Sequence, residues 1–296
     1  MRVRTLIVVA AVVLAGRRAP PTAGPEAVPV RWAEGTVHGF LELHAADGAL
    51  LAEGDLLQVP RDSDLESRLV FHFKDGSLFR ETVTFTQHAV FRLLDYRLEQ
   101  HGPAFPADLD VSLAAGAGGA YDVRTTSHKD GKVQRYSGKL DLPVDIANGL
   151  IPVIGKNVDR RAGRTVHIVA FTPKPYVIEL ELQPSAAEDN VVRFTLKPKL
   201  GLLLRVGAAL KHQTPPDSYL WILTQDVPAF VRFQGPMYSG PIWRIDLTRP
   251  RWSGAAGAGA GTDQPARGSA SSTNSRARRD TLRSPADSPA RRPTRP

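Results

Sequence analysis

An alternation of apolar and polar side chains with a period of two residues runs through the chain from Val30 to Trp252. It limits the fold more than any other feature. Residues 36–44 show it well, with Leu41 and Leu43 on either side of Glu42. Successive side chains of a β-strand point to opposite faces, so this period predicts strands rather than helices. The predicted strands are residues 36–44, 50–59, 66–73, 77–87, 90–100, 121–128, 132–142, 165–172, 176–183, 191–197, 202–210, 219–223, 229–233 and 242–247.

The clearest predicted hairpin joins residues 66–73 to residues 77–87 through Asp75-Gly76, a pair favoured in two-residue loops. With that loop, Phe73 lies opposite Leu78 on one face and His72 lies opposite Phe79 on the other. Both faces then carry apolar residues. We therefore expect one face to be covered by the core and the other, with Phe79, to line a partly apolar concavity.

One segment, Val144–Val158, has a helical pattern, because Ile146, Leu150 and Ile154 recur every four residues. Pro152 is expected to kink this helix or to split it into two short pieces. Many strands with one helix in the middle of the sequence predict a mainly β fold. We expect a strongly curved antiparallel sheet, half-barrel or barrel-like, with one short central helix region.

The formal net charge of +8 belongs to the two ends of the chain. Residues 1–24 carry +4 and residues 253–296 carry +5, whereas residues 25–252, the predicted single β-rich domain, carry −1. A basic nucleic-acid-binding domain is therefore not expected. Residues 253–296 contain one large aliphatic residue, Leu282, so we expect a disordered tail, Gly/Ala-rich and then rich in Arg, Ser and Pro. Its arginines are suited to an anionic surface of the cell envelope.

The N-terminus resembles an export signal. Arg2 and Arg4 precede an apolar run, Thr5–Gly16, and a Pro-rich flank follows this run. The predicted signal peptide and its flank together span residues 1–24. We therefore expect an exported protein, periplasmic or extracellular. Apart from this segment, no run reaches the roughly 18 apolar residues that a spanning helix needs, so no further transmembrane span is expected.

Catalytic and metal-binding signatures are missing from the sequence. It has no cysteine, which excludes thiolate metal sites, cysteine nucleophiles and disulfides. It also lacks the linear motifs of serine hydrolases, zinc proteases and nucleotide-binding loops. His38, Glu42 and His44 share a predicted strand face, but a metal site there needs another ligand, such as His72, from a neighbouring strand. We predict no catalytic residue, no metal and no cofactor.

Five residues are candidates for contact with a ligand: Phe79, Arg92, Tyr96, Tyr238 and Trp243. Arg92 alternates with Leu94 and Tyr96 on an apolar face, where its partner is either a strand carboxylate such as Glu81 or an anionic head group. Tyr238 and Trp243 follow two Gly-Pro turns. They either anchor the last strands to the core or form an aromatic platform for a ligand.

The segments Leu69–Phe85, Val90–Leu98 and Val144–Val158 together resemble the architecture of LolA-type exported lipid carriers, in which a curved antiparallel sheet is plugged by helices. The motif Gly-Pro-Met-Tyr-Ser-Gly-Pro-Ile-Trp is also similar to that of an uncharacterised bacterial exported family, which implies no activity. The first resemblance implies a lipid or another amphiphile as partner. Three functions stay open: non-enzymatic binding of such a ligand in the sheet concavity, hydrolysis of a cell-envelope polymer without a linear motif, and a structural or interaction module of the envelope.

Overall fold

The computed structural model describes residues 26–171, 174–188, 190–199, 217–237 and 240–248. Within these ranges fourteen antiparallel strands form one sheet, accompanied by one α-helix, α1 (Ile151–Asn157), and a short 3₁₀ turn, η1 (Ala115–Ala117). The predicted mainly β fold with a curved antiparallel sheet and one short helix is confirmed. The strands are β1 (Val37–His44), β2 (Leu50–Arg61), β3 (Asp64–Phe73), β4 (Leu78–Thr86), β5 (Arg92–His101), β6 (Ala107–Ala114), β7 (Ala120–Ser127), β8 (Val133–Lys139), β9 (Arg164–Ala170), β10 (Tyr176–Glu188), β11 (Val191–Lys199), β12 (Ser218–Leu223), β13 (Ala229–Gly235) and β14 (Trp243–Thr248).

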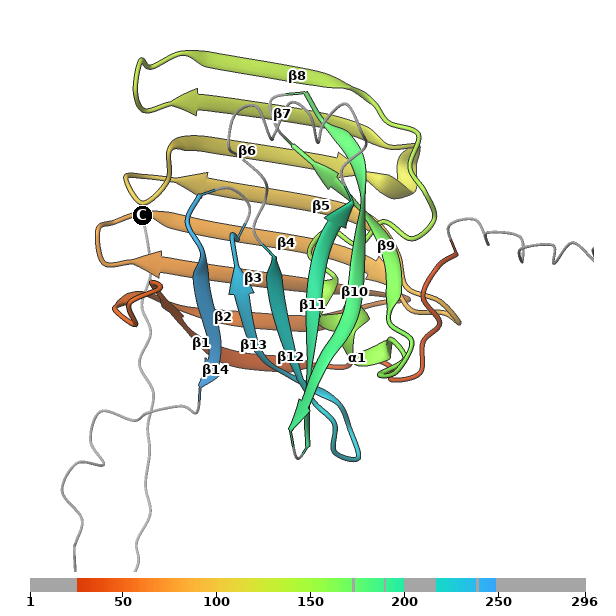
Figure 1. Cartoon of the computed structure of the whole chain (residues 1–296). Helices are drawn as coiled ribbons and strands as arrows, with labels where there is room; N and C mark the ends of the chain where they lie inside the picture. The colour runs from red at the N-terminus through yellow and green to blue at the C-terminus, as the bar shows by residue number, and fades with distance from the viewer. Residues whose placement is uncertain (1–25, 172–173, 189, 200–216, 238–239, 249–296) are drawn as a thin grey trace, which may run out of the picture. The chain divides into compact units, whose positions relative to one another are not determined.

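The sheet is one continuous ribbon that folds back on itself. Its order is β8-β7-β6-β5-β4-β3-β2-β1-β14-β13-β12-β11-β10-β9, so the first strand pairs with the last and β8 and β9 are the open edges. We call β1–β8 the first half and β9–β14 the second half. Figure 1 shows the strands of the first half running across the view behind those of the second half, which run up it. The two halves therefore pack face to face with crossed strands, as in orthogonal sheet packing.

Aromatic pairs join the two halves across the core. The ring of Tyr96 on β5 stacks on that of Phe171, just after β9, with the ring centres 5.8 Å apart. Trp243 at the start of β14 packs against Phe73 of β3 and against Phe105, with ring centres 5.4 and 5.8 Å apart. All five side chains are almost fully buried. The inward faces of the two halves thus supply the hydrophobic core.

The register of the predicted β3–β4 hairpin is wrong by one residue. The loop has three residues, 74–76, because the Phe73 N–H donates to the carbonyl of Ser77 and Gly76 adopts a φ of 86°. This is a turn followed by a left-handed residue, which adds one residue to the two expected. Phe71 consequently faces Phe79, and both are buried on the same side. The hairpin therefore has one apolar face toward the core rather than two.

The helix is shorter than its sequence pattern predicts. Residues 144–150 form turns, and α1 begins at Ile151, so Pro152 lies in the first helical turn instead of kinking a longer helix. Proline lacks an N–H, and the first turn is the place where that N–H has no helical partner. Ile146, Leu150 and Ile154 are buried as the pattern indicates.

Three predicted segments lie outside the described residues: the signal segment and flank of residues 1–24, the strand at residues 202–210 and the tail of residues 253–296. Where the structure describes the chain, no helix has the length and apolar character needed to cross a membrane.

Candidate functional site

A cavity of about 490 Å³ lies between the two halves of the sheet. One wall consists of inward-facing residues of β1 to β4, and the opposite wall is formed by β13, β14 and α1. The volume falls in the range of small-molecule sites, and the lining is mostly aliphatic and aromatic, as such sites commonly are.

Two glycines help to keep this space open. Gly39 of β1 faces the cavity, and a Cβ there would lie 3.0 Å from Cδ1 of Leu247. Gly149 in the turn before α1 has a φ of 67°, and a Cβ on it would overlap Val83 and lie 3.3 Å from the carboxyl carbon of Glu81. Only glycine both adopts that φ readily and lets the turn approach β4 this closely.

The segment of residues 31–35 forms one side of the cavity and is held by side chains from elsewhere in the fold. The Asn157 side-chain carbonyl of α1 accepts hydrogen bonds from the backbone N–H groups of Arg31 and Trp32, at 2.9 and 2.8 Å. Glu34 forms an ion pair with Lys156 of α1 at 2.5 Å and accepts a hydrogen bond from the Gln58 amide at 3.0 Å. The side chains of Glu34 and Lys156 are only 5% and 15% exposed, so this pair is shielded from bulk water.

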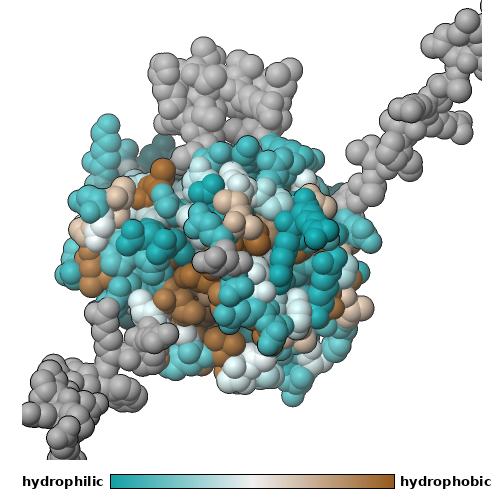
Figure 2. Space-filling view, turned by 60° about the horizontal axis from the view of Figure 1, so that its bottom comes forward, coloured by the Kyte–Doolittle hydropathy of each residue, from teal (hydrophilic) through white to brown (hydrophobic). Residues whose placement is uncertain are grey.

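Exposed apolar side chains surround part of the cavity. Trp32, Val37, Val227 and Leu247 all line it and are 38%, 39%, 68% and 44% exposed. Figure 2 shows apolar side chains gathered around a hollow on one face, with polar residues beside them. Single exposed apolar residues are ordinary, but a cluster that continues into a cavity is a pattern typical of sites that bind apolar partners.

Two carboxyl side chains line the cavity where the structure describes it, Glu34 and Glu81, and Glu81 lies on β4. The Glu81 side chain is half-buried, and its exposed part faces the cavity. Protein atoms surround its carboxyl group. One carboxyl oxygen accepts a hydrogen bond from the Tyr96 hydroxyl at 2.8 Å. Burial raises the pKa of Glu81 from 4.5 to about 7, and the bond from Tyr96 offsets this only in part.

This raised pKa predicts a pH-dependent stability. Between about pH 4.5 and pH 7 the folded chain holds a proton on Glu81 that the unfolded chain has lost, so the free energy of unfolding falls as the pH rises through this window. At 1.36 kcal/mol per pKa unit the full effect is about 3 kcal/mol. Urea unfolding at pH 5 and pH 8.5 measures it, and Glu81→Gln, which cannot ionise, should gain about that much relative to the wild type at the higher pH. An unchanged difference between the two proteins at both pH values would contradict this assignment.

The candidate ligand residues occupy different places. Phe79 lines the cavity, although it reaches it on the Phe71 face of the hairpin rather than opposite His72. Tyr96 is buried and donates its hydroxyl hydrogen to Glu81. Trp243 is buried among the aromatic residues of the core, which agrees with the first of its two predicted roles, anchoring the last strands. Tyr238 lies outside the described residues.

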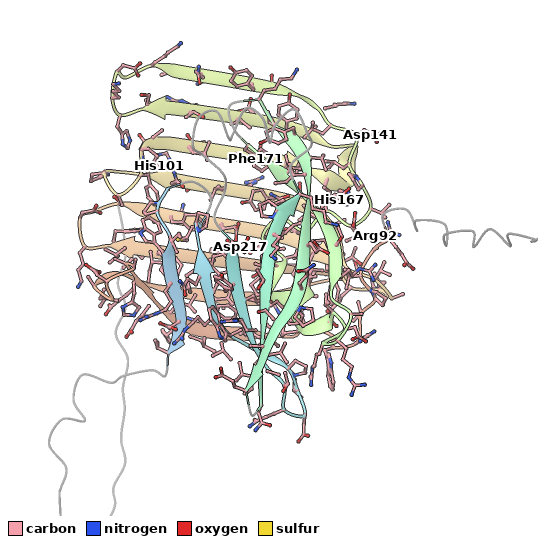
Figure 3. The ribbon with its side chains drawn as sticks, in the orientation of Figure 1. Arg92, His101, Asp141, His167, Phe171 and Asp217 are labelled. Carbon is pink, nitrogen blue, oxygen red and sulfur yellow. The ribbon has the colours of Figure 1, made fainter. Side chains whose placement is uncertain are left out.

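Arg92 does not lie on the face of Tyr96, contrary to the expectation from alternation. Thr84 pairs with Asp95 and Phe85 pairs with Leu93, so Leu94 is the extra residue of a β-bulge. The bulge shifts the alternation by one position, which turns Leu93 inward and Arg92 outward. Arg92 is exposed and is not part of the cavity lining (Figure 3).

Histidine–aspartate pairs occur outside the cavity. At one end of β5–β7, His128 lies 2.8 Å from Asp108 and His101 lies 2.8 Å from Asp110. Desolvation raises the pKa of Asp108, but the hydrogen bond from Gly102 and the nearby His128 outweigh it, so the pKa is below its usual value. These pairs link the ends of three neighbouring strands.

Further along the fold, Nδ1 of His167, which Figure 3 labels, lies 2.8 Å from the buried carboxyl of Asp145. This contact connects β9 to the turn before α1. His44 and Glu42 contact each other at 3.2 Å on β1. No group of three or more such side chains in the described parts of the chain is arranged to hold a metal ion.

Sequence reasoning missed the polar residues of the cavity, namely Glu34, Gln58, Ser67 and Lys156. Glu81 was considered, but as a partner of Arg92. Ser67 and Glu81 lie on the inward faces of their strands, among apolar residues at every second position. A polar residue on an otherwise apolar face is a signal that can be found in the sequence. The pairing of Glu34 with Lys156 has no local signal, because the two residues lie in distant parts of the sequence.

Comparison of the chain with protein-family models, with curated proteins and with solved structures finds no match, so the case for a function rests on the cavity and its lining.

Proposed function

We propose that this chain is a non-enzymatic binding protein that holds a hydrophobic or amphiphilic ligand between the two halves of its curved sheet. The observation that carries the proposal is the cavity of about 490 Å³, lined mostly by apolar side chains and edged by exposed ones. A site of this kind gains affinity by removing apolar ligand surface from water. The N-terminal pattern adds export to the proposal, and the arginines of residues 253–296 add an anionic envelope surface as a second partner.

The other two functions have less support. A polymer hydrolase needs an acid and a base that face a substrate, but no histidine occurs among the described cavity-lining residues, and the hydrogen-bond partner of Glu81 is Tyr96. A module that acts through a flat apolar surface needs no cavity. The resemblance to LolA-type carriers agrees with the proposed ligand class, because those proteins hold lipids against a curved sheet.

Filling the cavity is expected to weaken ligand binding. Ser67 of β3 faces the cavity, so Ser67→Phe places an aromatic ring where the ligand would lie. We expect the affinity for the neutral fluorophore 1-N-phenylnaphthylamine to fall at least about tenfold, which corresponds to 1.4 kcal/mol. Fluorescence titration of the full chain measures it.

The matched control is Thr82→Phe. Thr82 faces the opposite side of the sheet on the neighbouring strand, where it pairs with Arg68, and it is not part of the cavity lining. This variant should bind the fluorophore like the wild type, and circular dichroism should show native folding of both variants. If the wild type does not bind the fluorophore, or if Ser67→Phe binds it as well as Thr82→Phe does, the cavity is not the binding site.

A further inference from the structure

A line of polar side chains crosses the apolar wall of the cavity. Gln58 of β2 lies directly opposite Ser67 of β3, and Ser67 is diagonal to Glu81 of β4, which pairs with Leu69. All of these side chains face the cavity. At its other end the line continues through Gln58 to Glu34 and its ion pair with Lys156.

The two members of this line that lie on β3 and β4 have unused hydrogen-bonding capacity. Within the described residues, the Ser67 hydroxyl makes no hydrogen bond, and Glu81 uses one carboxyl oxygen, which accepts from Tyr96. Gly149 covers Glu81 with backbone alone and supplies no polar side chain. Polar groups in an apolar enclosure are costly unless they find partners, so a ligand that fits here carries a group for Ser67 and Glu81.

The charge of the lining indicates which group this is. Lys156 and Glu34 neutralise each other, so neither has charge to spare for a ligand. Burial keeps Glu81 largely protonated below pH 7. A ligand carboxylate would meet an acidic side chain, and the described lining residues offer it no cation outside the pair of Lys156 with Glu34. A hydroxyl, in contrast, accepts a hydrogen bond from a protonated carboxyl or from serine and also donates one.

We propose that the cavity selects a neutral amphiphile with a hydroxyl head group, such as a long-chain alcohol or a monoacylglycerol, whose hydroxyl binds Ser67 and Glu81 while its chain fills the apolar part. This inference rests on the proposed function and names the ligand class of the same site. It assigns Ser67 and Glu81 as the residues that determine specificity.

Displacement of 1-N-phenylnaphthylamine from the full chain at pH 6 by 1-decanol, decanoate and decylamine tests this assignment, because the three ligands share one chain length and differ in the head group. We expect 1-decanol to bind at least about tenfold more tightly than decanoate, since decanoate must bury a charge without a partner. Equal affinities for the alcohol and the carboxylate would overturn the assignment, and so would preferred binding of the amine.

Variants of Glu81 identify the group responsible. Glu81→Gln keeps a neutral hydrogen-bonding side chain and should bind 1-decanol within about twofold of the wild type, whereas Glu81→Leu should lose about tenfold. Because Glu81 lines the cavity, the fluorophore affinity of each variant is titrated first, and the affinity for 1-decanol is calculated from displacement with that value. A Glu81→Leu variant that binds 1-decanol as tightly as the wild type would contradict the role of Glu81. Failure of the wild type to bind the fluorophore would instead count against the proposed function itself.

Discussion

Replacing Trp243 with alanine is expected to lower the free energy of unfolding by about 4 kcal/mol, the largest effect of any substitution considered. Trp243 is only 5% exposed, and it contacts Phe73 and Phe105 with ring centres 5.4 and 5.8 Å away. Its removal leaves a cavity between β14 and the first half of the sheet, and surrounding side chains close such a space only in part. Chemical denaturation followed by circular dichroism measures the loss.

Trp243→Phe is the matched control, because phenylalanine keeps an aromatic ring against Phe73 and should cost less than about 2 kcal/mol. This variant should also bind 1-N-phenylnaphthylamine like the wild type, since Trp243 is not part of the cavity lining. A loss of affinity with unchanged stability would assign Trp243 to the ligand platform instead of the core.

Lys156→Ala is the substitution with the second largest expected effect, a loss of about 3 kcal/mol in the free energy of unfolding. The ammonium of Lys156 lies 2.5 Å from Glu34, whose side chain is 5% exposed. Without the lysine, Glu34 keeps its hydrogen bond from Gln58 but has lost the opposite charge that balances it. Because Glu34 belongs to the segment beside the cavity, we also expect this segment to open and amide exchange at residues 33–35 to accelerate.

The double variant Glu34→Gln/Lys156→Met distinguishes the charge from the packing. Both charges are then removed together, and their replacements have similar length, so the double variant should be more stable than Lys156→Ala alone. Urea unfolding of the wild type, Glu34→Gln, Lys156→Met and the double variant gives the coupling energy. If the double variant is as unstable as Lys156→Ala, the pair stabilises the fold through the lysine side chain itself rather than through its charge.

The alternation of apolar and polar residues predicted most of the strands, since each strand buries one face and the period of two is a local property. It missed β6, residues 107–114, and the predicted strand at residues 202–210 lies outside the described residues. The alternation was also not sufficient to predict the face of every residue. Leu94 forms a bulge because of its pairing with β4, and this reversed the side on which Arg92 lies. Gly76 lengthened the β3–β4 loop by one residue and shifted every cross-strand pair of that hairpin. One residue of slip exchanges the two faces of a strand, so small local irregularities decide which side chains meet.

The candidate site likewise combines residues that local sequence patterns predicted with residues that only tertiary contacts bring together. Phe79 was predicted to face a concavity and lines the cavity, but Arg92 does not, and the ion pair of Lys156 with Glu34 had no signal in the sequence. Neighbouring strands bring together residues close in sequence, such as Ser67 and Glu81. The approach of α1 to the segment of residues 31–35 depends on the folding of the whole sheet, through bonds such as those of Asn157.

The sequence by itself therefore determined most of the strands and the mainly β class of this protein, because side-chain period and turn residues act over a few residues. Only the tertiary structure decided that the sheet folds over on itself, that its two halves enclose a cavity, and that Glu81 lies within it beneath Gly149. The physical reason is that burial and the raised pKa of Glu81 arise from atoms on several strands, which meet once the first strand has paired with the last.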